Sequence, residues 1–306
     1  MTLLISSDKF AEFRAYLEKN GYVFEDRAYQ QFLAKKAGIV INLYTNGKIV
    51  LGGADQAERT RVEEYLCSLE ASQAVKLVKE YPAIEVSGTR IGTDEVGKGD
   101  YFGPLVVGGV IANDAQVEQL QELGVKDSKA LSDTTIKTLA VKIRKFLQPA
   151  QHTFILINPA KYNMLHKEMG NNVNRILGWG HARAIENLLI ANPVCKTAIA
   201  DQFGDQSYIE KALMRNGKKI NLIQSPKGER EATVAAASIL ARAELVDRFY
   251  EMNNTYGLTF PKGSTDVIET AKKFVLNYGD RALLNVAKVH FSITQKIPNI
   301  DVRELQ

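Results

Sequence analysis

Two adjacent carboxylates, Asp94 and Glu95, stand just before a glycine-rich segment, Gly97-Lys98-Gly99. Carboxylate oxygens are the ligands that hard divalent cations prefer. Glycine has no Cβ, so the backbone of this segment can approach a ligand closely and adopt a positive φ, while Lys98 adds a cation beside it. The segment therefore indicates metal and phosphate chemistry. The simpler alternative is a solvated corner between a strand and a turn.

Two further acids occupy similar positions later in the chain. Asp201 ends an apolar run and Glu229 directly follows Gly228. The C-terminal ends of core strands are where an α/β sheet usually presents its chemistry. Taken singly, Asp201 would be an ordinary turn residue and Glu229 a surface charge. Two carboxylates about 4 Å apart repel by roughly 4 kcal/mol at an effective dielectric of 20, so four in one pocket would need cations.

With these segments in view, the chain resembles the type 2 ribonucleases H and, among them, the ribonuclease HIII group. The matching blocks run in family order from about Ile91 to Lys296, and six ordered blocks are far more specific than one motif. They are GTDEVGKGDYFGPLVVGGV (92–110), VKDSKALSD (125–133), NNVNRILGWGHARAI (171–185), KGE with VAAASILAR (227–242), FPKGS (260–264) and AKVHFSITQK (287–296).

The resemblance implies an endoribonuclease that cuts the RNA strand of an RNA/DNA hybrid with two divalent ions, Mg²⁺ or Mn²⁺. It implies products with 5′-phosphate and 3′-hydroxyl ends. The implied catalytic, metal-binding carboxylates are Asp94, Glu95, Asp201 and Glu229. The implied substrate-binding residues are Gly97, Lys98 and Gly99, whose backbone would read ribose 2′-hydroxyls, with Lys129, Asn172 and Asn174 as further candidates.

The fourth carboxylate has two candidates. The loop from Glu229 to the VAAAS helix is a residue shorter than the family spacing, and Glu231 lies close enough to compete. The Lys-Gly-acid pattern is intact at Glu229, so we prefer that residue. A final Glu, where ribonuclease HII would have Asp, is itself an HIII-like trait.

Two rival functions come from other classes. A nucleotide triphosphatase is suggested by Gly92-x-x-x-x-Gly97-Lys98, which nearly spells a phosphate-binding loop, but Gly99 stands where a Ser or Thr should hold magnesium. The second rival is a non-catalytic protein that only binds hybrids or DNA. The presence of all the acids gives no support to a loss of catalysis.

Composition sets the broad class. A chain of 306 residues with 45% hydrophobic content can bury a sizeable core, and its net charge of +4 suits a nucleic-acid partner without proving one. No apolar run approaches the ~20 residues of a membrane span, and the start lacks a secretion signal. Cys67 and Cys195 lack metal-ligand spacing. We expect a cytoplasmic monomer with reduced thiols and no membrane contact.

The chain divides into residues 1–87, a small α+β domain, and residues 88–306, the catalytic domain. In the first part we expect a strand at 2–6, a helix capped by Asp8, a hairpin at 38–53 around Asn46-Gly47, a helix at 56–79 and a linker near 81–88. This part resembles the TATA-box-binding fold and would bind substrate. Candidate contacts, with ordinary solvated residues as the equal alternative, are Lys35, Lys36, Tyr44 and Lys48.

The second part alternates helices and strands, which predicts an α/β fold with a ribonuclease H-like mixed sheet flanked by helices. The expected strands are 91–96, 104–112, 152–157, 196–200 and 219–224. The expected helices are 114–123, 132–147, 171–191, 206–216, 232–252 and 265–279, the second capped by Ser128 or Ser132. His290 sits in an apolar context that favours a structural role, and the histidines share no zinc spacing.

Overall fold

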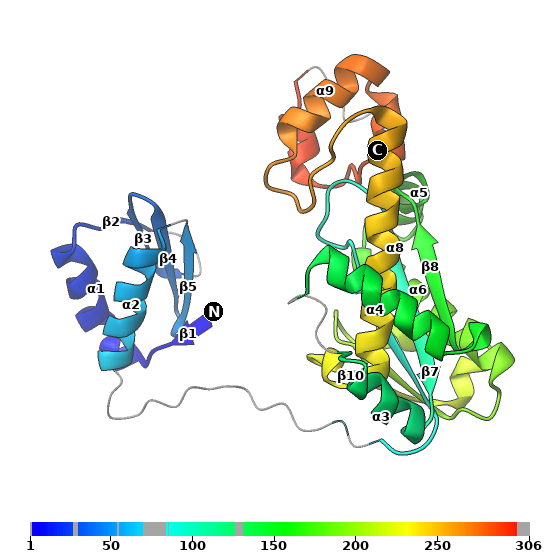
Figure 1. Cartoon of the computed structure of the whole chain (residues 1–306). Helices are drawn as coiled ribbons and strands as arrows, with labels where there is room; N and C mark the ends of the chain where they lie inside the picture. The colour runs from blue at the N-terminus through cyan, green and yellow to red at the C-terminus, as the bar shows by residue number, and fades with distance from the viewer. Residues whose placement is uncertain are drawn as a thin grey trace. The chain divides into compact units, whose positions relative to one another are not determined.

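The computed structural model describes residues 2–26, 30–53, 55–69, 84, 86–125 and 131–298. The chain folds as two compact units, residues 1–80 and 81–306. The division therefore comes a few residues before the expected boundary at 87. Figure 1 shows both units, each with its own sheet and helices.

The smaller unit is a five-stranded antiparallel sheet with two helices packed on one face. Phe13 and Leu17 from the first helix and Val62 and Leu66 from the second pack on the sheet. The expected hairpin is present, and Gly47 closes its turn with φ +82°. In sheet order the strands are β1 (Thr2–Leu4), β5 (Lys48–Gly53), β4 (Ile39–Tyr44), β3 (Gln30–Lys36) and β2 (Val23–Glu25), and the helices are α1 (Phe10–Lys19) and α2 (Gln56–Leu69).

Two details of this unit differ from expectation. Asp8 does not cap α1, because residues 7–9 form a 3₁₀ turn and Lys9 takes the N-cap position. Strands β2 and β3 were not predicted.

The helix predicted to reach Lys79 is described only to Leu69, and most of the predicted linker lies outside the described residues. Lys36, a candidate nucleic-acid contact, forms an ion pair with the buried Glu58 at 2.7 Å.

The larger unit contains the mixed sheet that the sequence predicts. Strands β10, β9 and β6 run parallel to one another, whereas β7 pairs in antiparallel fashion with both β6 and β8. In sheet order the strands are β10 (Asn221–Ser225), β9 (Thr197–Asp201), β6 (Arg90–Val96), β7 (Leu105–Ala112) and β8 (His152–Ile157).

Helices cover both faces of this sheet. One face carries α8 (Ala232–Tyr256), with α4 (Asp133–Phe146) and α3 (Asp114–Glu122) packed against it. The other carries α6 (Val173–Ala191), with α7 (Ser207–Ala212) and α5 (Pro159–Glu168) beside it. Figure 1 shows α8 running along the sheet and on to the C-terminal helix α9 (Ile268–Tyr278). The expected cap of α4 is Ser132, which accepts a hydrogen bond from the Thr135 amide.

Two glycines allow α8 to lie very close to the sheet. A Cβ on Gly92 would lie 2.2 Å from the Val234 nitrogen, and one on Gly108 would lie 2.3 Å from the Ala237 carbonyl oxygen. The alanines at 235–237 complete this contact from the helix side. The close packing brings the next residue of the helix, Ser238, over the C-terminal half of β6.

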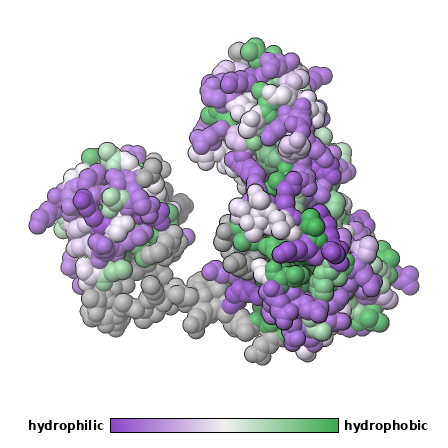
Figure 2. Space-filling model, in the orientation of Figure 1, coloured by the Kyte–Doolittle hydropathy of each residue, from purple (hydrophilic) through white to green (hydrophobic). Residues whose placement is uncertain are grey.

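No helix of the described ranges is long and apolar enough to cross a membrane. On the face drawn in Figure 2, hydrophilic residues predominate and hydrophobic residues lie among them.

Candidate active site

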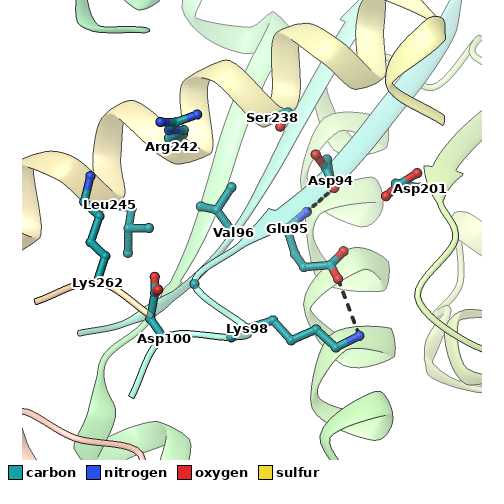
Figure 3. Close-up of a pocket in the computed structure, with 12 residues that line it drawn as sticks. Asp94, Glu95, Val96, Lys98, Asp100, Asp201, Ser238, Arg242, Leu245 and Lys262 are labelled. Atoms are coloured by element: carbon teal, nitrogen blue, oxygen red, sulfur yellow. Dashed lines mark hydrogen bonds and ion pairs between the residues drawn. The ribbon is translucent and has the colours of Figure 1, made fainter. Parts of the chain in front are cut away.

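The register of two parallel strands brings the predicted acids together. Thr93 pairs with Ala200 between β6 and β9, so Asp94 and Asp201 lie side by side, one residue further along each strand. Side chains alternate across a strand, so Asp94 faces α8 with Gly92, while Glu95 faces α6 with Thr93. Asp94, Glu95 and Asp201 line one pocket with the Gly97-Lys98-Gly99 turn and Ser238 (Figure 3).

Asp94 is the most buried of these acids, with 6% of its surface exposed. Its carboxylate accepts the Glu95 amide at 2.7 Å. Burial, and then the negative charges of Glu95 and Asp201, raise the pKa of Asp94 well above its usual value, while a hydrogen bond with Ser238 lowers it. A bound cation would relieve this destabilisation of the charged form.

Glu95 is held by a histidine that the sequence analysis left without a role. His181 on α6 is fully buried. Its Nε2 lies 3.1 Å from Glu95 Oε2 and its Nδ1 lies 2.8 Å from Thr93 Oγ1. The ring also stacks on Phe203, with centroids 5.0 Å apart. On the other side of the carboxylate, Lys98 Nζ lies 4.0 Å from Glu95 Oε1.

Asp201 is tied to the segment that carries the fourth acid. The Gly228 amide donates to Asp201 Oδ1 at 2.7 Å. A Cβ on Gly228 would lie 3.0 Å from the Asp201 Cα, a tight contact that glycine avoids. Glu229 follows in the 3₁₀ turn 228–230 and is half-buried. It therefore directly follows the residue that contacts Asp201, and it does not line the pocket itself.

The competing acid, Glu231, is engaged in structural contacts. Its Oε1 accepts from Arg90 Nε at 2.8 Å, in a pair whose side chains are 8% and 5% exposed. Its Oε2 accepts the Thr233 amide at 2.6 Å and the Thr233 hydroxyl, which caps the start of α8. Both oxygens of Glu231 are thus used in holding α8 and β6 together.

In the glycine turn, only one glycine has a left-handed backbone. Gly97 has φ +87°, and a Cβ there would lie 2.3 Å from the Pro104 carbonyl oxygen. Gly99 does not have a positive φ, and a Cβ there would meet open space. The turn joins the antiparallel strands β6 and β7. A phosphate-binding loop leads instead into a helix N-terminus, so this geometry argues against the triphosphatase alternative.

The turn is fixed from behind by Lys288, which is fully buried. Its ammonium donates to the Asp100 carbonyl at 2.8 Å and the Gly103 carbonyl at 2.7 Å. Burial lowers the pKa of Lys288 to about 7, against a smaller opposite effect of Asp100. Lys288 lies in the AKVHFSITQK block, and its role could not be predicted from the sequence.

The remaining predicted substrate residues do not line this pocket or lie outside the described residues. Asn172 is the N-cap of α6, where its side chain accepts the Asn174 amide at 2.9 Å. Its amide group also donates to the Tyr208 hydroxyl at 3.3 Å. Neither Asn172 nor Asn174 lines the pocket. Lys129 lies outside the described residues.

The donor set fits a hard divalent cation, because it consists of carboxylate oxygens around a buried Asp94. Among the described residues, no three His, Cys, Asp or Glu side chains converge tightly enough to hold a metal by themselves. His290 stacks on His166 and Tyr162, with centroids 4.4 and 5.3 Å away, and burial lowers its pKa to about 4.

Comparisons with known proteins place this chain among characterised families. The family model described as Ribonuclease HII matches residues 91–294. Ribonuclease HIII of Protochlamydia amoebophila is 39% identical over 283 residues, which cover 92% of this chain and 91% of that protein. Ribonuclease HIII of Chlamydia felis is 31% identical over 297 residues, which cover 96% of this chain and 95% of that protein.

Two solved structures extend the similarity to three dimensions. Bst-RNase HIII in complex with Mn²⁺ matches with a TM-score of 0.63 and 28% identity, covering 96% of both chains. RNase H3 of Aquifex aeolicus matches with a TM-score of 0.54 and 23% identity, covering 95% of this chain and 100% of that chain, and shows a shared fold.

Proposed function

Because the chain belongs to the type 2 ribonuclease H family and, within it, to the ribonuclease HIII group, we propose that it hydrolyses the RNA strand of RNA/DNA hybrids. The observation that carries the proposal is the shared pocket of Asp94, Glu95 and Asp201 with the glycine turn. Carboxylates can hold the metal ions that assist phosphodiester hydrolysis. The adjacent turn allows the backbone to contact a sugar closely.

The proposed cofactor is a pair of divalent ions, Mg²⁺ or Mn²⁺, held by Asp94, Glu95, Asp201 and Glu229. Two observations support Glu229 as the fourth ligand: its neighbour Gly228 bonds Asp201, and both oxygens of Glu231 have other partners. When bound, such ions supply an activated water and stabilise the leaving 3′-oxygen, which gives 5′-phosphate and 3′-hydroxyl ends. The similarity to a Mn²⁺ complex of Bst-RNase HIII supports this choice.

The protein's own part is to hold these carboxylates in place before substrate arrives. Ionised Glu95 can only accept a hydrogen bond, so a neutral His181 ring must carry its proton on Nε2. Nδ1 then accepts from the Thr93 hydroxyl. These two hydrogen bonds fix the direction of the Glu95 carboxylate without a positive charge on His181. Ser238 fixes Asp94 from the α8 side in the same way.

Discrimination of RNA from DNA is proposed to come from the backbone of Gly97 and Gly99, which would reach 2′-hydroxyls on successive nucleotides.

Lys129, Asn172 and Asn174 remain proposed substrate contacts. Residues 1–87 are proposed to add binding surface, and the protein is proposed to act as a monomer in the cytoplasm. Its two cysteines are both free, Cys67 exposed and Cys195 buried, which suits a reducing compartment.

Cleavage of three labelled duplexes tests this function. We expect the full-length protein with Mg²⁺ or Mn²⁺ to cut the RNA strand of a full hybrid and to leave double-stranded RNA intact. DNA with a single embedded ribonucleotide should be cut poorly, since reading several 2′-hydroxyls requires consecutive ribonucleotides. Efficient cutting at a lone ribonucleotide would contradict the HIII subtype, and cutting of double-stranded RNA would contradict hybrid specificity.

A further inference from the structure

The end of the pocket away from Asp94 and Asp201 carries two cationic side chains and the carboxylate of Asp100. Arg242 on α8 and Lys262 both line the pocket, and Figure 3 shows them on the far side from Asp94 and Asp201. Both bind one carboxylate, that of Asp133 at the start of α4. Arg242 lies 3.2 Å from Asp133 Oδ1, and Lys262 Nζ lies 2.5 Å from Asp133 Oδ2.

This cluster is open to solvent. The side chains of Arg242, Lys262 and Asp133 are 23%, 42% and 43% exposed. Each oxygen of the Asp133 carboxylate binds one of the two cations. Two oxygens of a phosphate group can bind an arginine and a lysine in the same way. An incoming phosphate could therefore replace Asp133 on both cations without a rearrangement of the backbone.

Two independent segments fix the distance from this cluster to the acids. Arg242 follows Ser238 by four residues on α8, so it lies on the same helix face about 6 Å further along the axis. Ser238 contacts Asp94. Lys262 is fixed through Gly263, whose amide donates to Asp100 Oδ1 at 2.6 Å and whose carbonyl accepts the Tyr101 amide at 2.8 Å.

That spacing matches a nucleic-acid strand. A strand in a duplex carries one phosphate per about 3.4 Å of helix axis. A strand whose reacting phosphate lies at the acids would therefore bring a phosphate one or two nucleotides away to Arg242 and Lys262. The acids and the cations then bind different phosphates of the same strand.

We propose, resting on the function proposed above, that Arg242 and Lys262 form a subsite for a non-reacting phosphodiester of the substrate. In the free protein Asp133 is the anion that occupies this subsite. The occupant is a phosphate of the RNA strand, because the reacting phosphate at the acids belongs to that strand.

A purely structural role for the cluster is the alternative. It would make Asp133 a link between α4 and α8. The same two helices are already joined by Lys137 and Asp247, which lie 2.6 Å apart. Lys137 is 50% exposed and does not line the pocket, so it provides a matched control lysine.

Binding of a fluorescent RNA/DNA hybrid to the full-length protein tests the subsite, measured in chelator over a range of salt concentrations. We expect Lys262→Gln to weaken binding and to reduce the slope of log K against log salt by about 0.9, the value of one lost phosphate contact. Lys137→Gln should leave the slope unchanged. An unchanged slope in Lys262→Gln, or an equal decrease in Lys137→Gln, would overturn the proposal.

Asp133→Asn separates the two roles by the sign of its effect. It removes the competing anion, so we expect hybrid binding to become tighter, opposite to Lys262→Gln. A structural link predicts that both variants bind more weakly, and that result would contradict the subsite. Cleavage of the hybrid by the wild-type protein is measured in parallel. If the wild type does not cleave, the proposed function is contradicted. If the wild type cleaves and the salt slope of Lys262→Gln is unchanged, only the subsite is contradicted.

Discussion

His181 Nε2 lies 3.1 Å from Glu95 Oε2, so a histidine in the middle of α6 holds a carboxylate at the end of β6. The histidine is fully buried and has Thr93 as its second partner, at 2.8 Å. Alternation along β6 turns Glu95 toward α6 and Asp94 toward α8, and the contact with His181 then holds the Glu95 carboxylate in place. It also makes Glu95 a carboxylate whose direction is set before any ligand binds.

Replacing His181 should therefore weaken metal binding as well as cleavage. We expect His181→Ala to lower Mn²⁺ affinity, measured by calorimetry without substrate, by about 10- to 100-fold, as is typical for residues that orient a metal ligand. Hybrid cleavage should decrease with it. His166→Ala is the control, because His166 is a half-buried histidine on α5 with no contact to an acid of the site. Unchanged Mn²⁺ affinity in His181→Ala would contradict the orienting role.

The fourth acid can be identified by comparing two isosteric variants. Glu229→Gln should lower the cleavage rate strongly and leave the free energy of unfolding nearly unchanged. Glu231→Gln breaks a buried pair with Arg90, so we expect it to cost about 3 kcal/mol of stability and to affect the rate less. Rate measurements and urea unfolding of both variants decide the point. The assignment fails if Glu231→Gln is the more damaging to catalysis in protein that is still folded.

The two glycines of the turn should respond differently to alanine. A Cβ at Gly99 meets open space, so Gly99→Ala should fold normally and still cleave hybrids poorly, because the methyl group would lie where the sugar binds. Gly97→Ala should lose about 1–2 kcal/mol of stability or more, since its backbone is left-handed and its Cβ would strike the Pro104 carbonyl. Full hybrid activity in Gly99→Ala would argue against backbone reading of the sugar.

Lys288 predicts a specific dependence of stability on pH. Its pKa is about 7 in the folded protein and about 10.4 when unfolded, so between these values the unfolded chain binds more protons. The free energy of unfolding should therefore rise with pH in this window, by up to about 1.4 kcal/mol per pH unit from this group. Urea unfolding of wild type and Lys288→Met at pH 7, 8 and 9 tests this. If the free energy of unfolding changed with pH equally in the two proteins, the prediction would be contradicted.

The sequence was sufficient to predict the sheet and three acids of the pocket. Apolar runs that end in acids predict strand ends, and parallel pairing then brings Asp94 and Asp201 together. His181 and Lys288 could not be predicted, because their partners are 86 and 188 residues away and depend on how α6 and the C-terminal segment pack. The missed helix α5 did carry a local signal, since Asn158 caps it and Pro159 begins it.

In the smaller unit, the first strand, both helices and the hairpin were predictable, whereas β2 and β3 were not. Gly47 and the alternating apolar residues before it are a strong local signal for β4 and β5. Strand β2 is short and only partly buried, so its alternation is weak. The choice between Glu229 and Glu231 also required the structure, because their spacing in the sequence is nearly equivalent and only the contacts of Arg90 and Gly228 separate them.

The most direct test of catalysis by this pocket is hybrid cleavage by Asp94→Asn in Mg²⁺, with hybrid binding measured on the same protein. Asp94 is buried beside Glu95, Asp201 and Ser238, whereas the proposed phosphate contacts, Arg242 and Lys262, lie elsewhere in the pocket. We predict that cleavage is abolished and that the dissociation constant for the hybrid changes little. Substantial cleavage by the folded variant would contradict the assignment of this pocket as the active site.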